Sequence, residues 1–469
     1  MNSSKIQLYN TLSRTKEEFV PIHKDEVRMY SCGPTVYDYA HIGNLRAYVF
    51  ADILQKTLEY YKYKIKRVIN ITDIGHLTSD ADDGEDKMAK GLKREGKPFT
   101  LEAMKELAVF YKEKFMEDLS AMNIKHPDII PFASDHIKED VEIVGKLLEK
   151  GFAYKTSDGI YFEIAKFPDY WQLSGRKDSP EEKTESRVGE NVEKKNQADF
   201  ALWKFSAKDG LGYETKIGKG FPGWHIECSA MSIKYLGEQF DIHTGGIDHI
   251  PVHHTNEIAQ SETYTGKKPF VRVWMHNNFL DINNGEKMAK SGDGFITLQT
   301  VKEKGISPIA YRFWILMGHY RTKMNFNWEA LGGAETALGR LYGLYLELGN
   351  DIGAVHEEYR NKFKEYLGDD LDTPRALTIL WDMLKDPNMS PADKKATTLD
   401  FDKVLGLGFE SLKEVDQEEI PAEIAQLAAL RQAARGSKDF QKSDELRKKI
   451  NSLGYEIKDT DGGQKISKI

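Results

Sequence analysis

The sequence predicts an α/β fold, in which a Rossmann-type catalytic domain with a parallel sheet is followed by an all-α region. Residues 27–31 alternate apolar and polar side chains, residues 45–61 carry apolar side chains at helical spacing, and residues 65–71 again form a strand-like run. Because a strand, a helix and a second strand in this order begin a parallel sheet, we expect ligands at the carboxyl ends of the strands.

The middle of the chain is predicted to extend this sheet and to add an inserted segment. We expect helices at residues 100–122 and 135–151 and a polar, exposed insertion at residues 166–198. Strands at residues 240–243 and 271–274 are expected to return to the sheet.

Nearly all of the chain from about residue 298 onward is predicted to be helical. Residues 334–348 and 375–384 carry apolar stripes, which are typical of packed amphipathic helices. The tail has the pattern of a small helical unit and is more basic than the rest. We therefore expect a catalytic domain, a helical bundle and a small basic unit, at residues 1–320, 321–420 and 421–469.

The composition is typical of a globular protein of the reducing cytoplasm. The 469 residues are 40% hydrophobic and 30% charged, and no apolar run approaches the roughly 20 residues that a membrane helix needs. The first residues do not resemble a secretory signal, and two cysteines do not make a disulfide scaffold. The net charge of -8 argues against general coating of nucleic acids but allows a local basic surface. We expect a cytoplasmic monomer without membrane contact.

The two cysteines, one histidine and one glutamate are candidate metal ligands. Cys32 follows the first predicted strand, and Cys228 lies in the stretch Gly-Trp-His-Ile-Glu-Cys-Ser. His253 and Glu257 are four residues apart and share one face of a predicted helix. Two thiolates, one imidazole and one carboxylate are a donor set that suits zinc. We expect one zinc ion per chain.

Each of these residues taken alone has a simpler explanation. A lone cysteine is more often a small buried hydrophobe, and a His-x-x-x-Glu pair usually lies on the surface. The zinc hypothesis is favoured because all four residues fall at predicted strand ends or helix starts of one sheet. His254 would point elsewhere and is expected to be a cap or core residue.

His41-Ile42-Gly43-Asn44 opens a helix directly after a strand. The amino terminus of a helix attracts anions, a glycine there lets the backbone approach a ligand closely, and a histidine can donate to a phosphate oxygen. A plain helix cap explains these four residues equally well.

Lys287-Met288-Ala289-Lys290-Ser291 follows a loop with two asparagines and a glycine. Two lysines on such a loop can clamp a triphosphate as charge develops on the leaving pyrophosphate. A similar run, Lys87-Met88-Ala89-Lys90, occurs earlier in the chain and is most simply a solvated helix face.

Together these stretches resemble the class I aminoacyl-tRNA synthetases, and specifically the cysteinyl-tRNA synthetase family. The resemblance runs from about residue 6 to about residue 460. In chain order, the motifs that carry it are Cys-Gly-Pro-Thr-Val-Tyr-Asp with the HIGH-type signature, Asn-Ile-Thr-Asp, the tryptophan–cysteine motif, the histidine–glutamate motif and the KMSKS-type loop, at residues 32–44, 70–73, 223–232, 253–261 and 287–291.

The resemblance implies an ATP-dependent ligation of L-cysteine to tRNA(Cys) through cysteinyl-adenylate, with ATP and Mg²⁺ as the nucleotide substrate. It implies a connective segment inserted at about residues 100–200, a KMSKS-type loop at 287–291 and an anticodon-binding tail. The implied zinc ligands are Cys32, Cys228, His253 and Glu257. The implied cysteine-side residues are Gly33, Thr72 and Trp224. The implied ATP-side and catalytic residues are His41, Gly43, Asn44, Asp248 near the ribose, Lys287 and Lys290.

Zinc makes chemical sense for such an enzyme because cysteine and serine differ by one atom. A merely shaped pocket separates such pairs by about 1–3 kcal/mol. A metal that binds a thiolate far better than a hydroxyl would reject serine at the binding step.

The chain departs from the family pattern at several positions. Asn44 replaces the last histidine of the HIGH-type signature, Ala289 replaces the usual serine, and residues 75–84 are an apparent insertion. Ile466 stands where the family's tail has a tryptophan. The effect of Asn44, the role of the insertion and the way this tail recognises an anticodon therefore stay open.

Seven basic residues between 431 and 449 suit phosphate contact, although a solvated charged helix explains them equally well. The rival functions are a cysteine ligase acting on a small amine and, because of Asn44, an inactive RNA-binding paralogue.

Overall fold

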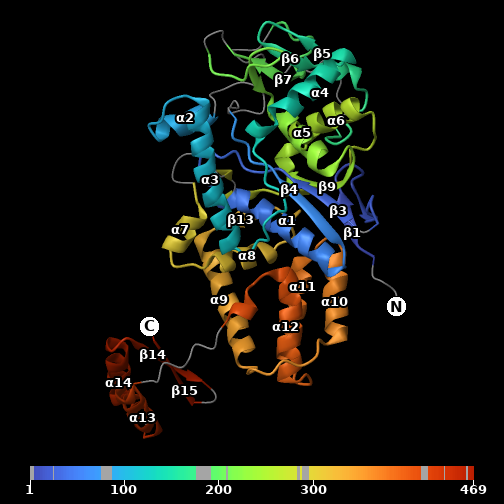
Figure 1. Cartoon of the computed structure of the whole chain (residues 1–469). Coiled ribbons are helices and arrows are strands. Elements are labelled where there is room, and N and C mark those ends of the chain that lie inside the picture. Colours follow the sequence, from blue (N-terminus) through green and yellow to red (C-terminus); the bar gives the residue numbers. More distant parts are fainter. Residues whose placement is uncertain are drawn as a thin grey trace. The chain divides into compact units, whose positions relative to one another are not determined.

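The computed structural model describes residues 5–24, 26–74, 87–175, 192–206, 210–282, 286–287, 295–412, 421–437, 439–460 and 463–468. The chain divides into two compact units, Met1–Phe409 and Glu410–Ile469 (Figure 1). The division of the first unit near residue 320 stays a prediction.

A four-stranded parallel sheet forms the centre of the first unit, and this confirms the predicted α/β fold. In spatial order its strands are β10, β9, β3 and β4, at Val271–Asn277, Phe240–Gly246, Glu26–Ser31 and Lys64–Ile69. Helix α1 (Ile42–Tyr60) follows β3 and leads to β4, as the sequence predicts. The central strands are almost fully buried, which is usual when helices cover both faces of a parallel sheet.

Helices lie on both sides of this sheet (Figure 1). On one side, α5 (Trp224–Leu236) packs against β3 and β4, and α4 (Ile137–Glu149) and α6 (His253–Thr265) pack against α5. Tyr30 and Phe240 of the strands meet Met231 and Ile258 of the helices in one buried hydrophobic cluster. This packing places the first turns of α5 and α6 beside the carboxyl end of β3.

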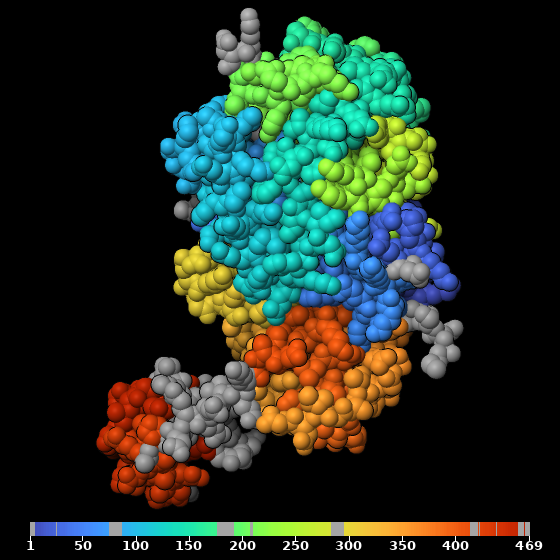
Figure 2. Space-filling view, in the orientation of Figure 1, coloured from blue at the N-terminus to red at the C-terminus, as the bar shows by residue number. Residues whose placement is uncertain are grey.

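The part of the chain between β4 and α5 contains helices and an antiparallel sheet, and it forms much of the face seen in Figure 2. Its helices α2 and α3 and its strands β5, β6, β7 and β8 lie at Lys87–Arg94, Leu101–Ala121, Ala153–Lys155, Gly159–Phe162, Phe200–Phe205 and Gly220–Pro222. That a connective segment is inserted at about residues 100–200 stays a prediction.

The prediction that residues 166–198 are an exposed polar insertion is wrong for its first part. Phe167, Tyr170 and Leu173 are buried in the hydrophobic cluster, and the Tyr170 hydroxyl donates to the amide oxygen of Asn256. These apolar residues are spaced among charged ones, so the average polarity of the stretch concealed them. Residues 176–191 lie outside the described residues.

The later part of the first unit is helical, as predicted. Its helices α7 to α12 span Leu298–Glu303, Pro308–Leu316, Trp328–Leu346, Glu357–Gly368, Thr373–Lys385 and Pro391–Leu405. Local residues explain where they begin and end: α12 starts after the cap Ser390 with Pro391 in its first turn, and it stops at Gly406, whose φ of 62° is left-handed. Three short strands, β11, β12 and β13, form a small sheet, at Leu280–Ile282, Glu286–Lys287 and Met324–Phe326. A terminal hairpin of β1 and β2 spans Gln7–Asn10 and Thr15–Glu18.

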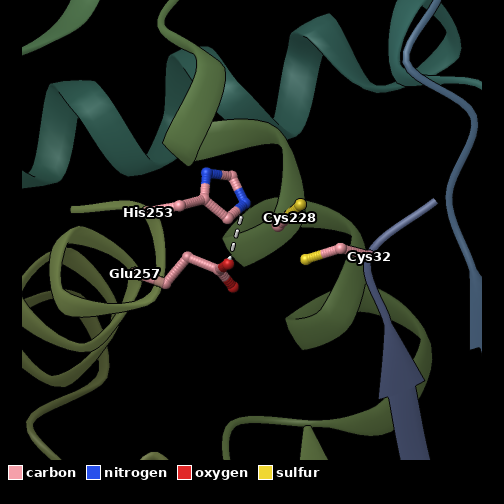
Figure 3. A group of neighbouring side chains, drawn as sticks. All are labelled: Cys32, Cys228, His253 and Glu257. Atoms are coloured by element: carbon pink, nitrogen blue, oxygen red, sulfur yellow. Dashed lines mark ion pairs between the residues drawn. The ribbon is translucent and has the colours of Figure 1, made fainter. Parts of the chain in front are cut away.

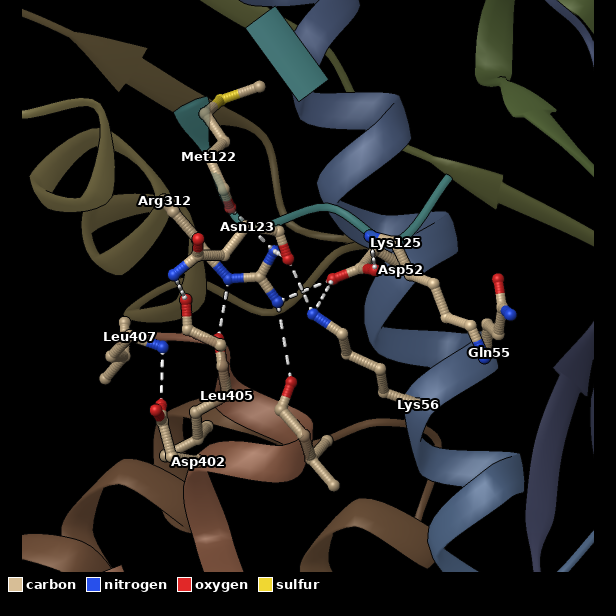
Figure 4. A network of polar contacts seen from close by, with 12 residues as sticks. Asp52, Gln55, Lys56, Met122, Asn123, Lys125, Arg312, Asp402, Leu405 and Leu407 are labelled. Carbon is tan, nitrogen blue, oxygen red and sulfur yellow. Dashed lines mark hydrogen bonds and ion pairs between the residues drawn. The ribbon is translucent and has the colours of Figure 1, made fainter. Parts of the chain in front are cut away.

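A buried polar network joins the helical region to α1 (Figure 4). Arg312 of α8 is fully buried, and its Nη2 lies 2.7 Å from Oδ2 of Asp52 on α1. The same guanidinium donates to the carbonyl oxygens of Met122 at 3.1 Å and Leu405 at 2.6 Å. One side chain therefore links α1, the residue after α3, α8 and the end of α12.

The second unit consists of α13 (Ala422–Gly436), α14 (Phe440–Ser452) and a hairpin of β14 (Tyr455–Thr460) and β15 (Gly463–Lys468). The two helices agree with the predicted helical unit, whereas the hairpin was not predicted. A small core holds the unit together, made of Ile424, Leu427, Ala428, Ile450 and Ile457.

In the part of the chain that the structure describes, no helix has both the length and the apolar character needed to cross a membrane.

Candidate metal centre and nucleotide pocket

Four side chains that are far apart in the sequence meet at the carboxyl end of β3 (Figure 3). Cys32 directly follows β3, Cys228 lies in α5, and His253 and Glu257 stand one turn apart at the start of α6. One sulfur, nitrogen or oxygen atom from each lies within 4.8 Å of those from the other three. The packing of α5 and α6 against the sheet thus brings the predicted donor set together.

The imidazole and the carboxylate of this cluster are each held by a second buried group. The Nε2 atom of His253 lies 3.1 Å from Oε1 of Glu257, and its Nδ1 lies 2.8 Å from Nδ1 of His225. The other carboxylate oxygen, Oε2 of Glu257, lies 3.0 Å from Nε2 of His243. Such outer partners orient metal ligands and tune their basicity.

His254 does not point away from the cluster, and that part of the prediction is wrong. It is fully buried, as a core residue is, but its Nε2 lies 3.3 Å from Sγ of Cys32. Its Nδ1 lies 2.7 Å from Nε2 of His276. The reason is that the first eleven residues of α6 are buried on every side, so neighbouring positions on the helix both face protein.

These histidines produce a second possible donor set, which consists of Cys32, His243, His254 and Glu257. The two sets share Cys32 and Glu257 and therefore exclude each other. The second set contains one thiol where the first contains two. Zinc binds thiolate strongly, so the set with both Cys32 and Cys228 suits it better.

The protonation of the cluster follows from burial and from its mutual contacts. Burial raises the pKa of the Cys32 thiol, but the neighbouring Cys228 thiol and His254 outweigh it and hold that pKa well below its usual value. The Cys32 sulfur and burial together raise the pKa of Cys228. Although burial opposes its charge, contacts with Cys32 and Glu257 raise the pKa of His253 to about 10. His243 and His253 likewise overcome burial and lower the pKa of Glu257 to about 2. The cluster thus pairs an anionic sulfur and carboxylate with a cationic ring.

A cavity of about 380 Å³ opens beside the cluster. Most of the predicted substrate and nucleotide residues line it, namely Gly33, His41, Gly43, Asn44, Trp224 and Asp248, together with the predicted zinc ligand Cys32. The Trp224 ring lies 4.4 Å from the His253 ring, measured between centroids. The cluster residue Cys32 therefore lies in the cavity wall, and Trp224 of the same wall lies beside the cluster residue His253.

Two of these residues have clear local roles. His41 is the cap of α1, since its Nδ1 accepts from the backbone N–H of Asn44 at 3.1 Å, and it lines the cavity at the same time. The cap explanation of the His-Ile-Gly-Asn stretch is therefore confirmed, and phosphate binding at this helix start stays a prediction. Gly33 has no room for a side chain, because a Cβ atom there would lie 1.5 Å from the carbonyl oxygen of Asn70. That close approach joins the ends of β3 and β4.

Thr72 is placed differently from the other predicted residues. It is buried and is not among the described residues that line the cavity. Its hydroxyl donates to Oε2 of Glu227 and accepts from the amide of Asn70, both at 3.2 Å. Thr72 therefore connects the end of β4 to the residue next to Cys228.

The two lysines of the predicted triphosphate clamp are only partly covered by the structure. Lys287 lies in β12, and its backbone stands opposite that of Asp281 in the antiparallel neighbour β11. Lys290 lies outside the described residues, and so does the apparent insertion at residues 75–84.

Lys87 is a cavity residue that the sequence analysis missed. The prediction of a solvated face holds for Lys90, which is exposed, but is wrong for Lys87, which is only 9% exposed and lines the cavity. Its Nζ lies 5.1 Å from the centroid of the Trp224 ring. The available signal was the apolar spacing of Met88, Gly91 and Leu92, which marks the same side of α2 as buried.

The histidine set around the cluster was also missed. Of the 13 histidines, six lie between residues 225 and 276, at His225, His243, His249, His253, His254 and His276. That concentration in one ninth of the chain was a usable signal for a site.

The chain is similar to known proteins over nearly its whole length. The profile of the tRNA synthetases class I (C) catalytic domain matches residues 18–336, and that of the cysteinyl-tRNA ligase anticodon binding domain matches residues 417–466. The chain is 45% identical over 464 residues to cysteine–tRNA ligase 1 of Burkholderia lata, covering 98% of this chain and 96% of that protein. It is 41% identical over 492 residues to the cysteine–tRNA ligase of Treponema denticola, covering 97% and 98%.

In fold the chain is similar to the Mycobacterium tuberculosis methionyl-tRNA synthetase in complex with methionyl-adenylate. That likeness has a TM-score of 0.54 at 14% identity and covers 82% of this chain and 90% of the other. It supports the class I fold alone, whereas the two profiles and the relatives reach further. The chain therefore belongs to the cysteinyl-tRNA synthetase family of the class I aminoacyl-tRNA synthetases.

Proposed function

We propose that this protein ligates L-cysteine to tRNA(Cys) in an ATP-dependent reaction that proceeds through cysteinyl-adenylate. The observation that carries the proposal is one cavity that contains both halves of the required chemistry. Its wall includes Cys32 of the four-residue cluster and, at the start of α1, His41, Gly43 and Asn44. A sulfur-selective group and a phosphate-binding helix terminus are thereby within reach of one bound adenylate.

We propose that Cys32, Cys228, His253 and Glu257 hold a zinc ion. Their donor atoms lie close together, three of the four residues are buried, and the set carries the anionic sulfur and carboxylate that a divalent cation neutralises. Bound there, zinc would accept the thiolate of cysteine and not the hydroxyl of serine, which supplies the discrimination that shape alone lacks.

The residues on the amino-acid side have distinct proposed roles. Trp224 forms the wall of the cavity next to His253, where the substrate side chain would lie. Gly33 lines the cavity and would contact the bound cysteine through its backbone, since the Asn70 carbonyl leaves no room for a side chain at this position. Thr72 supports this end by its hydrogen bond to Glu227, beside Cys228.

On the nucleotide side, the proposed catalysis is positioning and charge stabilisation. His41 and Gly43 at the start of α1 would hold the triphosphate, Asn44 would add a hydrogen-bond donor, and Asp248 would lie near the ribose. Lys287 and Lys290 would stabilise the leaving pyrophosphate, and Mg²⁺ would accompany ATP. The cysteine carboxylate attacks the α-phosphorus, pyrophosphate leaves, and a terminal ribose hydroxyl of the tRNA then displaces AMP.

The second unit is proposed to bind the anticodon. Five basic residues on its helices are exposed and suit phosphate contact, namely Arg435, Lys442, Arg447, Lys448 and Lys449. Arg431 is one of the seven basic residues that the sequence suggests for phosphate contact. It is buried, at only 1% exposed, and so is not available for that contact. Lys438 lies outside the described residues. Because residues 417–466 match an anticodon-binding profile, a tRNA acceptor is favoured over a small amine.

The decisive experiment is cysteine-dependent exchange between ATP and pyrophosphate, followed by aminoacylation of a tRNA with a GCA anticodon. We expect exchange with cysteine and none with serine, and then transfer to this tRNA. Exchange without transfer to the tRNA would support the small-amine ligase. No exchange by zinc-loaded protein would support the inactive paralogue and overturn the proposal.

A further inference from the structure

We propose that Lys87 binds the carboxylate of the amino-acid substrate, an inference that rests on the proposed function. Lys87 is the first residue of α2 and lines the cavity with its side chain almost fully buried. The sequence around it, Lys-Met-Ala-Lys, resembles the triphosphate clamp further along the chain, but the two lysines of this run differ sharply in exposure.

The Lys87 ammonium lies near the end of the cavity where the amino-acid substrate is expected. Its Nζ lies 5.1 Å from the centroid of the Trp224 ring, within the range of a cation–π contact. The same ring lies 4.4 Å from the ring of His253 and 6.1 Å from that of His249, measured between centroids. The ammonium and His253 of the four-residue cluster therefore both lie close to the same Trp224 ring.

The Lys87 ammonium is largely withdrawn from water. Loss of water costs a charged group free energy. The adjacent Trp224 face offsets part of this cost. The ammonium would attract an anionic ligand in the cavity, because water screens two charges less at a buried group.

The substrates offer two kinds of anion, and the geometry favours the carboxylate. The phosphates are expected at the start of α1, where His41 caps the helix and packs 6.0 Å from the Phe295 ring. The thiol of cysteine is expected at the cluster. Only the α- and β-carbons separate that thiol from the carboxylate, so the carboxylate of a bound cysteine would lie beside Trp224, within reach of the long Lys87 side chain.

This contact would also help the chemical step. The carboxylate must approach the α-phosphorus of an anionic triphosphate, and a neighbouring cation reduces the repulsion between the two groups. Lys87 would thus be a substrate-binding residue whose main effect is on cysteine affinity.

The test compares the binding of L-cysteine with that of L-cysteinol, which has the thiol and the amine but a hydroxymethyl group in place of the carboxylate. The full-length, zinc-loaded protein is titrated by calorimetry as wild type, Lys87→Met, Lys87→Arg and Lys90→Met. Lys90→Met is the matched control, since it removes the exposed lysine of the same helix. Thermal unfolding of each variant reports on folding.

We expect Lys87→Met to weaken L-cysteine binding roughly 10- to 100-fold, the size of one buried charge-assisted hydrogen bond. The affinity for L-cysteinol should stay at the wild-type value, Lys87→Arg should recover most of the cysteine affinity, and Lys90→Met should change neither. Equal weakening of both ligands would show that Lys87 only shapes the cavity and would overturn the inference, as would unchanged binding of both. If the wild type itself neither binds cysteine nor drives exchange, the proposed function fails instead.

Discussion

The Nε2 atom of His243 lies 3.0 Å from Oε2 of Glu257, on the side of the carboxylate that His253 does not contact. A strand of the central sheet thereby orients a residue of the proposed metal centre on α6. The same contact makes His243 a member of the competing donor set with Cys32, His254 and Glu257. Substitution of a residue that belongs to only one of the two donor sets shows which set holds the metal.

The first prediction concerns Cys228, which belongs only to the proposed zinc set. Cys228→Ser is nearly the same size but replaces a strong zinc ligand by a weak one. We expect the purified variant to lose zinc in elemental analysis and to show a steeply raised Michaelis constant for cysteine. Stoichiometric zinc in this variant would count against the ligand assignment.

The second prediction concerns His243, which the proposed set places outside the metal's own ligands. Because it orients Glu257, His243→Gln should keep one zinc per chain but bind it roughly 10- to 100-fold more weakly, as measured by competition with a chelator. Complete loss of zinc here, together with retention in Cys228→Ser, would assign the metal to the second set.

The third prediction concerns the proposed triphosphate clamp. Lys290→Ala should slow adenylate formation by about 10²- to 10³-fold, the effect of removing one donor that stabilises developing charge. Cysteine binding, measured without ATP, should stay unchanged, because the lysine is assigned to the pyrophosphate side. A loss of cysteine affinity comparable to the loss of rate would contradict that assignment.

The sheet and the four-residue cluster were predictable because each depends on a local pattern placed at a known point of the fold. The alternation at residues 27–31 and the helical spacing after it identify β3 and α1, and Cys32 follows the strand directly. The carboxyl ends of parallel strands meet at one edge. Spacing alone does not pair Cys32 with Cys228; their predicted places at strand ends or helix starts of one sheet favour the pair, and the family resemblance implies it.

The features that sequence reasoning missed depend on contacts between distant segments. The spacing of Met88, Gly91 and Leu92 marks the Lys87 side of α2 as buried, but no local pattern shows that its neighbour is Trp224. His254 faces Cys32 because α6 is covered on all sides, which a one-sided helical pattern does not anticipate. The β14–β15 hairpin was missed because its polar, lysine-rich strands lack a continuous apolar face in the sequence.

The fourth prediction concerns the stability of the junction between α1 and the helical region. Arg312→Met would leave Asp52 buried with less compensation and would remove hydrogen bonds to the carbonyls of Met122 and Leu405. We expect the free energy of unfolding to fall by about 3–5 kcal/mol in urea titrations. Lys56→Met is the matched control, since it retains the Arg312–Asp52 pair and should cost much less. Equal losses in the two variants would show that Arg312 is not the centre of the network.

The last prediction follows from the pKa of Lys56. Burial, and next the nearby Arg312, lower this pKa from 10.5 to about 8, although Asp52 lies 2.9 Å away and opposes the shift. Between these two pH values the unfolded chain holds a proton that the folded chain has released, so stability rises with pH across this window. Below pH 8 both states are protonated, and the burial of the charged ammonium costs its full amount.

The shift corresponds to about 3 kcal/mol at most. We therefore expect the free energy of unfolding of the wild type, minus that of Lys56→Met, to increase by up to this amount as the pH rises from 8 to 10.5. Because other titrating groups are common to both proteins, the difference measured at each pH isolates Lys56. Lys90→Met, which removes an exposed lysine, should show no comparable trend. A difference between wild type and Lys56→Met that stays constant across the window would show that Lys56 keeps its proton in the folded protein.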